Sequence, residues 1–84
     1  MKEKELGKVI HYYDKAMVAV VKLTGGGLKM GDSVKFVHNN NEFSQPVSSM
    51  EVDYKQIQSA KKDEEVAIKV EQKTHEGACV YKVE

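Results

Sequence analysis

Apolar residues in this chain recur in short stretches separated by glycine, asparagine and charged residues, and no long stretch repeats with the 3.6-residue period of a helix. β-Branched and aromatic residues dominate residues 7–13 and 16–23, which predicts two strands. Val34, Phe36 and His38 then alternate with Lys35 and Val37, which predicts a third strand at residues 33–38. Further strands are expected at residues 42–52, 66–70 and 79–83.

Turn-forming residues divide these stretches at intervals near ten residues. Thr24–Gly27 contains three successive glycines, which allow positive φ angles, and Asn39–Asn41 is a strong turn signal because asparagine tolerates the left-handed region. Pro46 cannot donate a hydrogen bond, so it is expected on an edge strand or at a bulge. About seven short antiparallel strands predict an all-β fold, either a barrel or a sandwich.

The 84 residues are enough for one hydrophobic core only. We predict a charged N-terminal lead-in at residues 1–6 and a single β domain at residues 7–84. Thirteen lysines and no arginines balance thirteen acidic residues, so no overall field attracts nucleic acid or anionic lipid. Any RNA contact is therefore expected to be local, and the lack of arginine disfavours base-specific recognition.

The single cysteine, Cys79, cannot form an internal disulfide, and the chain shows no signal peptide or 20-residue apolar span. These features predict a cytoplasmic protein that does not interact with membranes. His75 and Cys79 are four residues apart, and His11 or His38 could be added to them as zinc ligands. Paired ligand motifs are absent, so we expect no metal site, no catalytic residue and a buried, inert Cys79.

Several motifs in order along the chain resemble the second, β-barrel domain of the translation GTPases, the elongation factor Tu group. They are Gly7-Lys8-Val9, Leu28-Lys29-Met30-Gly31-Asp32, the segment from Phe43 to Met50, and the segment from Gly77 to Val83. This resemblance implies a small antiparallel β-barrel that helps to hold aminoacyl-tRNA or packs on ribosomal RNA. The chain is too short to hold the GTPase domain as well, so we expect no nucleotide binding, no cofactor and no enzymatic activity.

Two functional hypotheses follow. The first is a non-catalytic module that docks on tRNA, the ribosome or a partner protein, with Lys55, Lys61 and Lys62 as its contact residues beside Tyr54. The competing interpretation of residues 61–65 is a self-neutralising solvated loop, because acidic residues follow the two lysines directly. The second hypothesis is a protein-interaction accessory domain of a separately encoded enzyme, since similar barrels occur beside enzymes such as collagenase-like peptidases. The sequence does not determine the oligomeric state.

Tyr12 and Tyr13 are adjacent in a predicted strand and therefore point to opposite faces. One ring is expected in the core and the other in solvent, where it is the better candidate for stacking on a partner. Met17, Met30 and Met50 are interpreted as core filler or surface residues.

Overall fold

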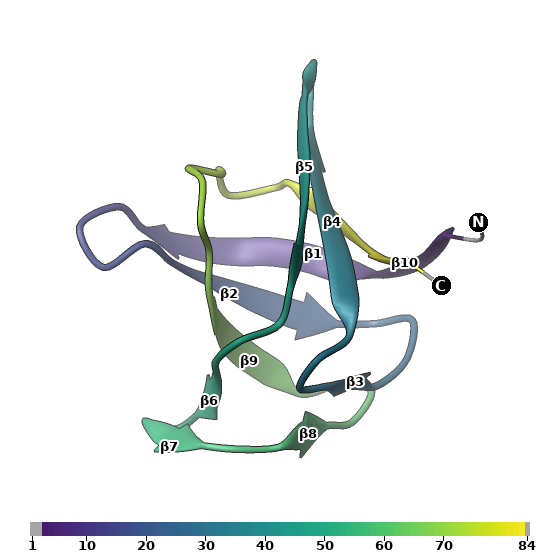
Figure 1. Ribbon diagram of the computed structural model, residues 1–84, viewed down its shortest axis with the longest axis vertical. Coiled ribbons are helices and arrows are strands. Elements are labelled where there is room, and N and C mark those ends of the chain that lie inside the picture. The colour runs from purple at the N-terminus through teal and green to yellow at the C-terminus, as the bar shows by residue number, and fades with distance from the viewer. Residues whose placement is uncertain (1–2, 84) are drawn as a thin grey trace.

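The computed structural model describes residues 3–83, which form strands and connecting turns only (Figure 1). The ten strands are β1 (Glu3–Tyr13), β2 (Val18–Leu23), β3 (Leu28–Lys29), β4 (Ser33–His38), β5 (Asn41–Pro46), β6 (Met50–Val52), β7 (Lys55–Gln56), β8 (Ser59–Ala60), β9 (Glu65–Lys69) and β10 (Cys79–Val83). The predicted small all-β antiparallel fold is confirmed.

Eight strands form one curled sheet in the order β5-β4-β10-β1-β2-β9-β6-β7, and β3 pairs with β8 apart from it. All of these pairings are antiparallel. Within residues 3–83 the hydrogen-bonded order has two ends, β5 and β7, so the sheet curls like a barrel without a complete ladder around it. The β4–β5 hairpin extends beyond the rest of the molecule (Figure 1).

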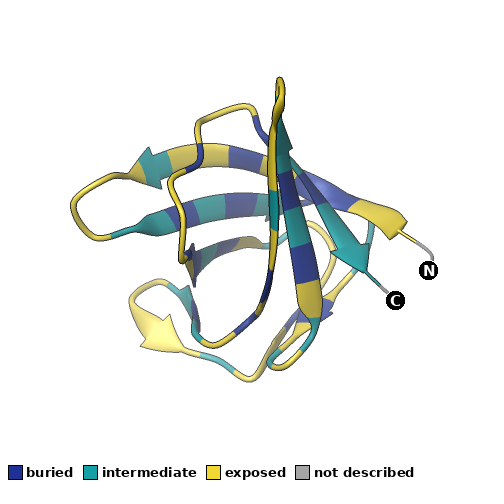
Figure 2. Ribbon diagram, turned by 45° about the horizontal axis from the view of Figure 1, so that its top comes forward, coloured by how far each residue is buried: buried dark blue, intermediate teal, exposed yellow. Residues whose placement is uncertain are grey.

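The core lies inside the curl, and inward and outward residues alternate along β2 and β4 (Figure 2). In β4 the expected alternation is confirmed, with Val34 and Phe36 fully buried and Lys35 and Val37 half-buried on the other face. The buried apolar residues are Leu6, Val9, Ala19, Val21, Leu23, Leu28, Val34, Phe36, Val47, Met50, Ala60, Val66, Ile68, Val70, Ala78 and Val80.

The strand predicted at residues 42–52 is divided into β5 and β6. Pro46 ends β5, which is an edge strand as predicted, and the Val47 N–H that follows still donates to the Asp32 carbonyl oxygen. The polar connection that follows contains two-residue strands, β7 and β8, which account for most of the difference between seven predicted strands and ten observed. Such short strands carry no alternation that a sequence pattern could reveal.

β1 begins inside the segment predicted as a lead-in. Leu6 is buried in the core, and the Glu3 carboxylate accepts a hydrogen bond from the Lys35 ammonium at 3.1 Å. This bond, together with the nearby Glu42 carboxylate, raises the pKa of Lys35 above its usual value. Burial and pairing thus attach residues 3–6 to the sheet.

β1 contains two register shifts, one in its pairing with β10 and one in its pairing with β2. The first lies between Glu5 and Gly7 opposite β10, and the second lies between Val9 and His11 opposite β2. Each shift inserts an extra residue, as a β-bulge does, and strengthens the local twist. The bends allow one strand to pair with both neighbours while the sheet curls.

A buried glutamine links β5 to the end of β9 across the gap in the ladder. The Gln45 side-chain amide donates to the Lys69 carbonyl oxygen at 2.8 Å, and its carbonyl oxygen accepts from the Glu71 N–H at 2.7 Å. Gln45 is only 4% exposed, so its own amide group has little access to water and depends on these two bonds. A side chain therefore makes two of the bonds that a closed ladder would otherwise supply.

Across the described residues, no helix is long and apolar enough to cross a membrane.

Candidate functional site

The outer face of the sheet carries apolar residues where β2, β9 and β6 lie side by side. Cross-strand pairing aligns Val20 of β2 with Ala67 of β9, and Ala67 with Glu51 of β6. Val18 lies two residues before Val20 and therefore on the same face. Val18, Val20 and Ala67 are only half-buried, although most small antiparallel sheets expose a polar outer face. This face therefore has an apolar floor that the rest of the chain leaves partly uncovered.

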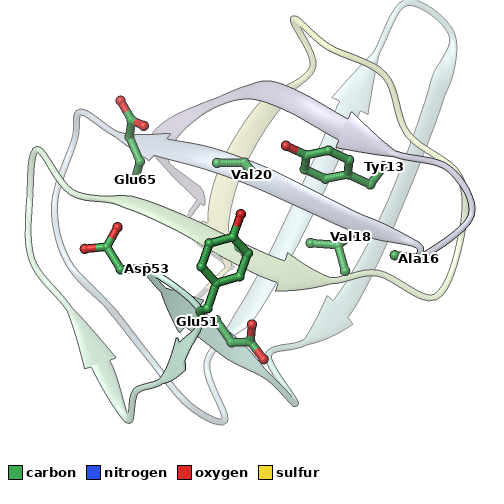
Figure 3. Close-up of a pocket in the computed structure, with 9 residues that line it drawn as sticks. Tyr13, Ala16, Val18, Val20, Glu51, Asp53 and Glu65 are labelled. Carbon is green, nitrogen blue, oxygen red and sulfur yellow. The ribbon is translucent and has the colours of Figure 1, made fainter.

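Aromatic and acidic residues surround this floor and form a groove of about 510 Å³, called the outer groove below (Figure 3). Its lining consists of Tyr13, Ala16, Val18, Val20, Glu51, Asp53, Tyr54, Glu65 and Ala67. In the close-up, the carboxylates of Asp53 and Glu65 lie toward one end and Tyr13 toward the other, with Val18 and Val20 between them. The groove combines an apolar base with a rim of carboxylates and phenol rings.

Tyr54 is the most unusual residue of this rim. It is 98% exposed and lies in the two-residue connection of the β6–β7 hairpin, where Val52 pairs with Lys55. Asp53 and Tyr54 have φ angles of 53° and 66°, the signature of a type I′ turn, which normally takes asparagine and glycine. A tyrosine in the left-handed region costs about 1–2 kcal/mol. Strain of this kind, at an exposed aromatic residue without a core role, is characteristic of functional positions.

We predict that Tyr54→Gly stabilises the domain, because glycine adopts this turn conformation without a Cβ clash. The expected gain is about 0.5–1 kcal/mol, after the extra flexibility of glycine in the unfolded chain is allowed for. For a domain of this size the melting temperature should rise by about 3–6 °C. Thermal unfolding followed by far-UV circular dichroism measures the change.

The matched control is Tyr54→Ala, which removes the ring and keeps the Cβ strain. Its melting temperature is expected to stay close to that of the native chain. A Tyr54→Gly variant that melts below the native chain would show that the ring stabilises the fold and that the turn is not under strain.

The electrostatics of the outer groove are negative. Glu51, Asp53 and Glu65 contribute three carboxylates, and its lining includes no lysine. Glu65 has one neighbouring cation, the Lys22 ammonium at 4.0 Å, and both side chains are well exposed to solvent. Among the described residues, Glu51 and Asp53 take part in no ion pair. Two carboxylates are therefore available to a positively charged partner.

The lysines predicted to contact RNA lie outside this lining. Lys55 follows Tyr54 at the start of β7, and Lys61 and Lys62 follow β8. In the turn that follows β8, the Glu64 carboxylate accepts a hydrogen bond from the Lys61 backbone N–H at 2.6 Å. Acidic groups thus share the turn with the lysines, as in the self-neutralising interpretation, and RNA contact by these lysines stays a prediction.

The histidines and the cysteine are not part of the groove lining, although the His11 ring stacks beside that of Tyr13 with the centroids 6.1 Å apart. The rings of His38 and His75 are 4.8 Å apart, and His11 contacts the Glu76 carboxylate at 3.3 Å. Within residues 3–83, no three histidine, cysteine or acidic side chains are placed to hold a metal ion. Cys79 is half-buried instead of fully buried, because the inward position beside it belongs to Val80.

Part of the outer groove could have been found from the sequence. The prediction for Tyr12 and Tyr13 is confirmed, because Tyr12 packs against the core and Tyr13 is 54% exposed. The continuous apolar stretch in β2 was a further signal, since a domain this small can cover only one face of such a strand. Asp53, Glu51 and Glu65 were missed because only the pairing of β2, β9 and β6 brings them together.

The fold defines the class to which this domain is similar. It matches the C-terminal domain of a U32 peptidase from Geobacillus thermoleovorans with a TM-score of 0.87, covering 96% of this chain and 93% of that domain at 19% sequence identity. The selenomethionine variant of that domain gives a TM-score of 0.83 over 90% of this chain and 95% of that chain, again at 19% identity. These similarities establish a shared fold.

A curated relative is similar in sequence. The uncharacterized protease MJ0090 of Methanocaldococcus jannaschii is 33% identical over 78 residues, which are 92% of this chain. The chain spans only 19% of the length of that protease. No protein-family profile matches the chain.

The resemblance to the translation GTPases is therefore wrong, since both comparisons lead to peptidases. The turn that suggested it is built by local bonds: the Asp32 carboxylate accepts from the Lys29 N–H at 2.9 Å, and Gly31 has a φ of 89°. Any small β protein can use such a turn between two strands. Its presence does not distinguish a translation-factor barrel from this domain.

Proposed function

We propose that this domain is a non-catalytic protein-binding module that serves as an accessory domain to an enzyme, and that this enzyme is a U32-type peptidase. The observation that carries the proposal is Tyr54, a strained and almost completely exposed tyrosine at the rim of the apolar outer groove. Tyrosine is enriched among residues that dominate protein interfaces, where its ring buries a large area at low entropic cost.

The comparisons support the enzymatic class of the partner. The Geobacillus fold neighbour is a distinct C-terminal domain of a U32 peptidase, and the Methanocaldococcus protease is about five times longer than the segment it shares with this chain. In both proteins the similar segment accompanies a larger remainder. A module with an exposed apolar groove suits contact with such a larger body.

The charge of the outer groove favours a protein partner over RNA. Glu51, Asp53 and Glu65 would repel a phosphate backbone that approached the groove. The apolar floor of Val18, Val20 and Ala67 offers the kind of surface that side chains of another protein cover.

The test is direct binding to a U32-type peptidase from the same organism, measured by surface plasmon resonance after nuclease treatment. A tag on the C-terminus is placed away from Tyr13, because β10 pairs with residues 3–8 of β1 and Tyr13 lies at the other end of that strand. Tyr54→Gly and Tyr54→Ala are each expected to weaken binding by about 30-fold, the loss of one interface hot spot. Glycine relieves the strain of the turn and alanine keeps it. A loss of binding that both variants share therefore cannot be explained by a change in folding.

The control replaces Lys55, Lys61 and Lys62 together by glutamine, which should leave peptidase binding unchanged. No measurable binding to the peptidase, or equal binding by the Tyr54 variants, would contradict the proposal. Binding of RNA that the triple lysine replacement abolishes would instead support the lysine patch as the functional surface.

A further inference from the structure

We infer that the outer groove binds an extended protein segment that inserts an arginine or lysine side chain between the tyrosines and the carboxylates of its rim. The inference rests on the proposed function, because it assigns the chemistry of the partner segment at the same groove. The carboxylates of Glu51 and Asp53 supply the charge complementarity, and the rings of Tyr13 and Tyr54 supply the aromatic surface.

Among the described residues, the nearby cation that the pockets show is Lys69, which lines the adjoining hollow together with Glu51 and forms no ion pair with it. Neither Glu51 nor Asp53 takes part in an ion pair among the described residues. They lie on β6 and in the turn that follows it, at the edge of a half-buried apolar floor. Such a floor excludes part of the surrounding water when it is covered, which strengthens a charge-assisted hydrogen bond to a guanidinium or ammonium group.

The tyrosines offer a second and independent attraction for the same groups. A cation over the face of a phenol ring is attracted by the ring quadrupole, and arginine also stacks on it. Tyr54 is 98% exposed, so the domain itself covers almost none of this ring. An aromatic ring beside two free carboxylates suits a cationic side chain better than a neutral or an acidic one.

The shape of the outer groove favours an extended segment. It continues into a neighbouring hollow of about 300 Å³ that shares Ala16, Val18, Glu51 and Ala67 with it. Ser49 and Lys69 complete this hollow and offer a hydroxyl and an ammonium group. A segment with its basic side chain at the acidic rim would place neighbouring apolar side chains along Val18 and Ala67, with polar contacts beyond them.

The test uses three synthetic peptides that differ at one position: acetyl-Ala-Val-Arg-Val-Ala-amide, the same peptide with citrulline for arginine, and the same peptide with glutamate. Citrulline keeps the shape of arginine and removes its charge. Each peptide is titrated into the isotope-labelled domain and followed by two-dimensional NMR. The arginine peptide is expected to shift the amides of Glu51, Tyr54 and Ala67 and to bind about tenfold more tightly than the citrulline peptide.

Two carboxylate variants locate the charge. Asp53→Asn and Glu51→Gln should each weaken binding of the arginine peptide by about fivefold and leave binding of the citrulline peptide unchanged. Glu71→Gln is the matched control, because Glu71 is exposed and lies outside the groove lining. Tyr54→Ala should weaken the arginine peptide more than the citrulline peptide.

Equal affinity for arginine and citrulline, shift changes away from the groove, or no shift changes up to about 10 mM peptide would each overturn the inference. Its failure is distinguishable from failure of the proposed function. Peptidase binding that needs Tyr54 but is unchanged by Asp53→Asn and Glu51→Gln would retain the accessory module and reject the cationic segment. Arginine-dependent peptide binding without any peptidase binding would do the reverse.

Discussion

Gly7→Ala is expected to destabilise the domain more than any other substitution considered, by more than about 3 kcal/mol. The backbone of Gly7 pairs with Leu23 in β2, and a methyl group added to it would overlap the Lys22 carbonyl oxygen. The obstacle is backbone in the middle of the sheet, so no side chain can rotate to make room. Overpacking of a core typically costs 1–3 kcal/mol, and a clash with backbone should exceed about 3 kcal/mol. That is a large part of the roughly 5–10 kcal/mol available to a domain of 84 residues.

Urea unfolding followed by circular dichroism measures this loss. Lys8→Ala is the matched control, because Lys8 is the next residue of the same strand and its side chain is exposed. Its stability should stay within about 0.5 kcal/mol of the native chain. A Gly7→Ala variant within about 1 kcal/mol of the native chain would show that β1 and β2 can separate there at little cost.

Gln45→Leu is expected to destabilise the domain by about 2–4 kcal/mol, the second largest effect. The substitution removes both hydrogen bonds that the side chain makes, leaving the Lys69 carbonyl oxygen and the Glu71 N–H without their partner. Leucine is similar in volume to glutamine, so the loss should come from unsatisfied polar groups and not from a cavity. Urea unfolding at pH 7 measures the difference, and Ser44→Ala, at an exposed position of the same strand, is the control.

Gln45→Glu separates the two bonds. A carboxylate can still accept from the Glu71 N–H, but it cannot donate to the Lys69 carbonyl oxygen, so burial beside that oxygen should raise the pKa of the new carboxyl group in the folded state. The protonated form can make both bonds. The stability of this variant, relative to the native chain, should therefore be lowest near pH 7 and recover as the pH falls toward about 4.3, the ordinary value for glutamate.

No recovery at low pH in the Gln45→Glu variant would argue against the donated bond to Lys69. A Gln45→Leu variant as stable as the native chain would show that the gap between β5 and β9 needs no such link. The expected results would instead identify Gln45 as the side chain that holds β5 to the end of β9.

Most strands were predictable because their signals are local. Alternation along β4 and β9 is enough to assign four residues to the core, namely Val34, Phe36, Val66 and Ile68. Pro46 correctly indicated an edge strand, and Asn39 takes the positive φ that its turn required. The short strands β3, β7 and β8 were not predictable, because two residues are too few for a periodic pattern.

Part of the candidate site was likewise predictable from local signals in the sequence, and part was not. The apolar outer positions of β2 and an exposed tyrosine at Tyr12 or Tyr13 follow from composition and strand geometry. The resemblance to translation factors rested on four short motifs in order along the chain, and the Gly-Asp turn among them is one that local bonds alone can build. The comparisons overturned it because the similarity in sequence to a protease covers 92% of the chain, whereas each motif covers only a few residues.

The sequence by itself determined an all-β domain of one core, since hydrophobic alternation and turn residues act over a few neighbouring positions. Only the tertiary structure decided which residues meet. Glu51 and Glu65 are fourteen positions apart, and Tyr13 is farther still along the chain, yet the register of β1, β2, β9 and β6 assembles them around one groove. Strand pairing depends on contacts between distant segments, which no local pattern records. The strain at Tyr54 likewise appears only once the two-residue turn between β6 and β7 is defined.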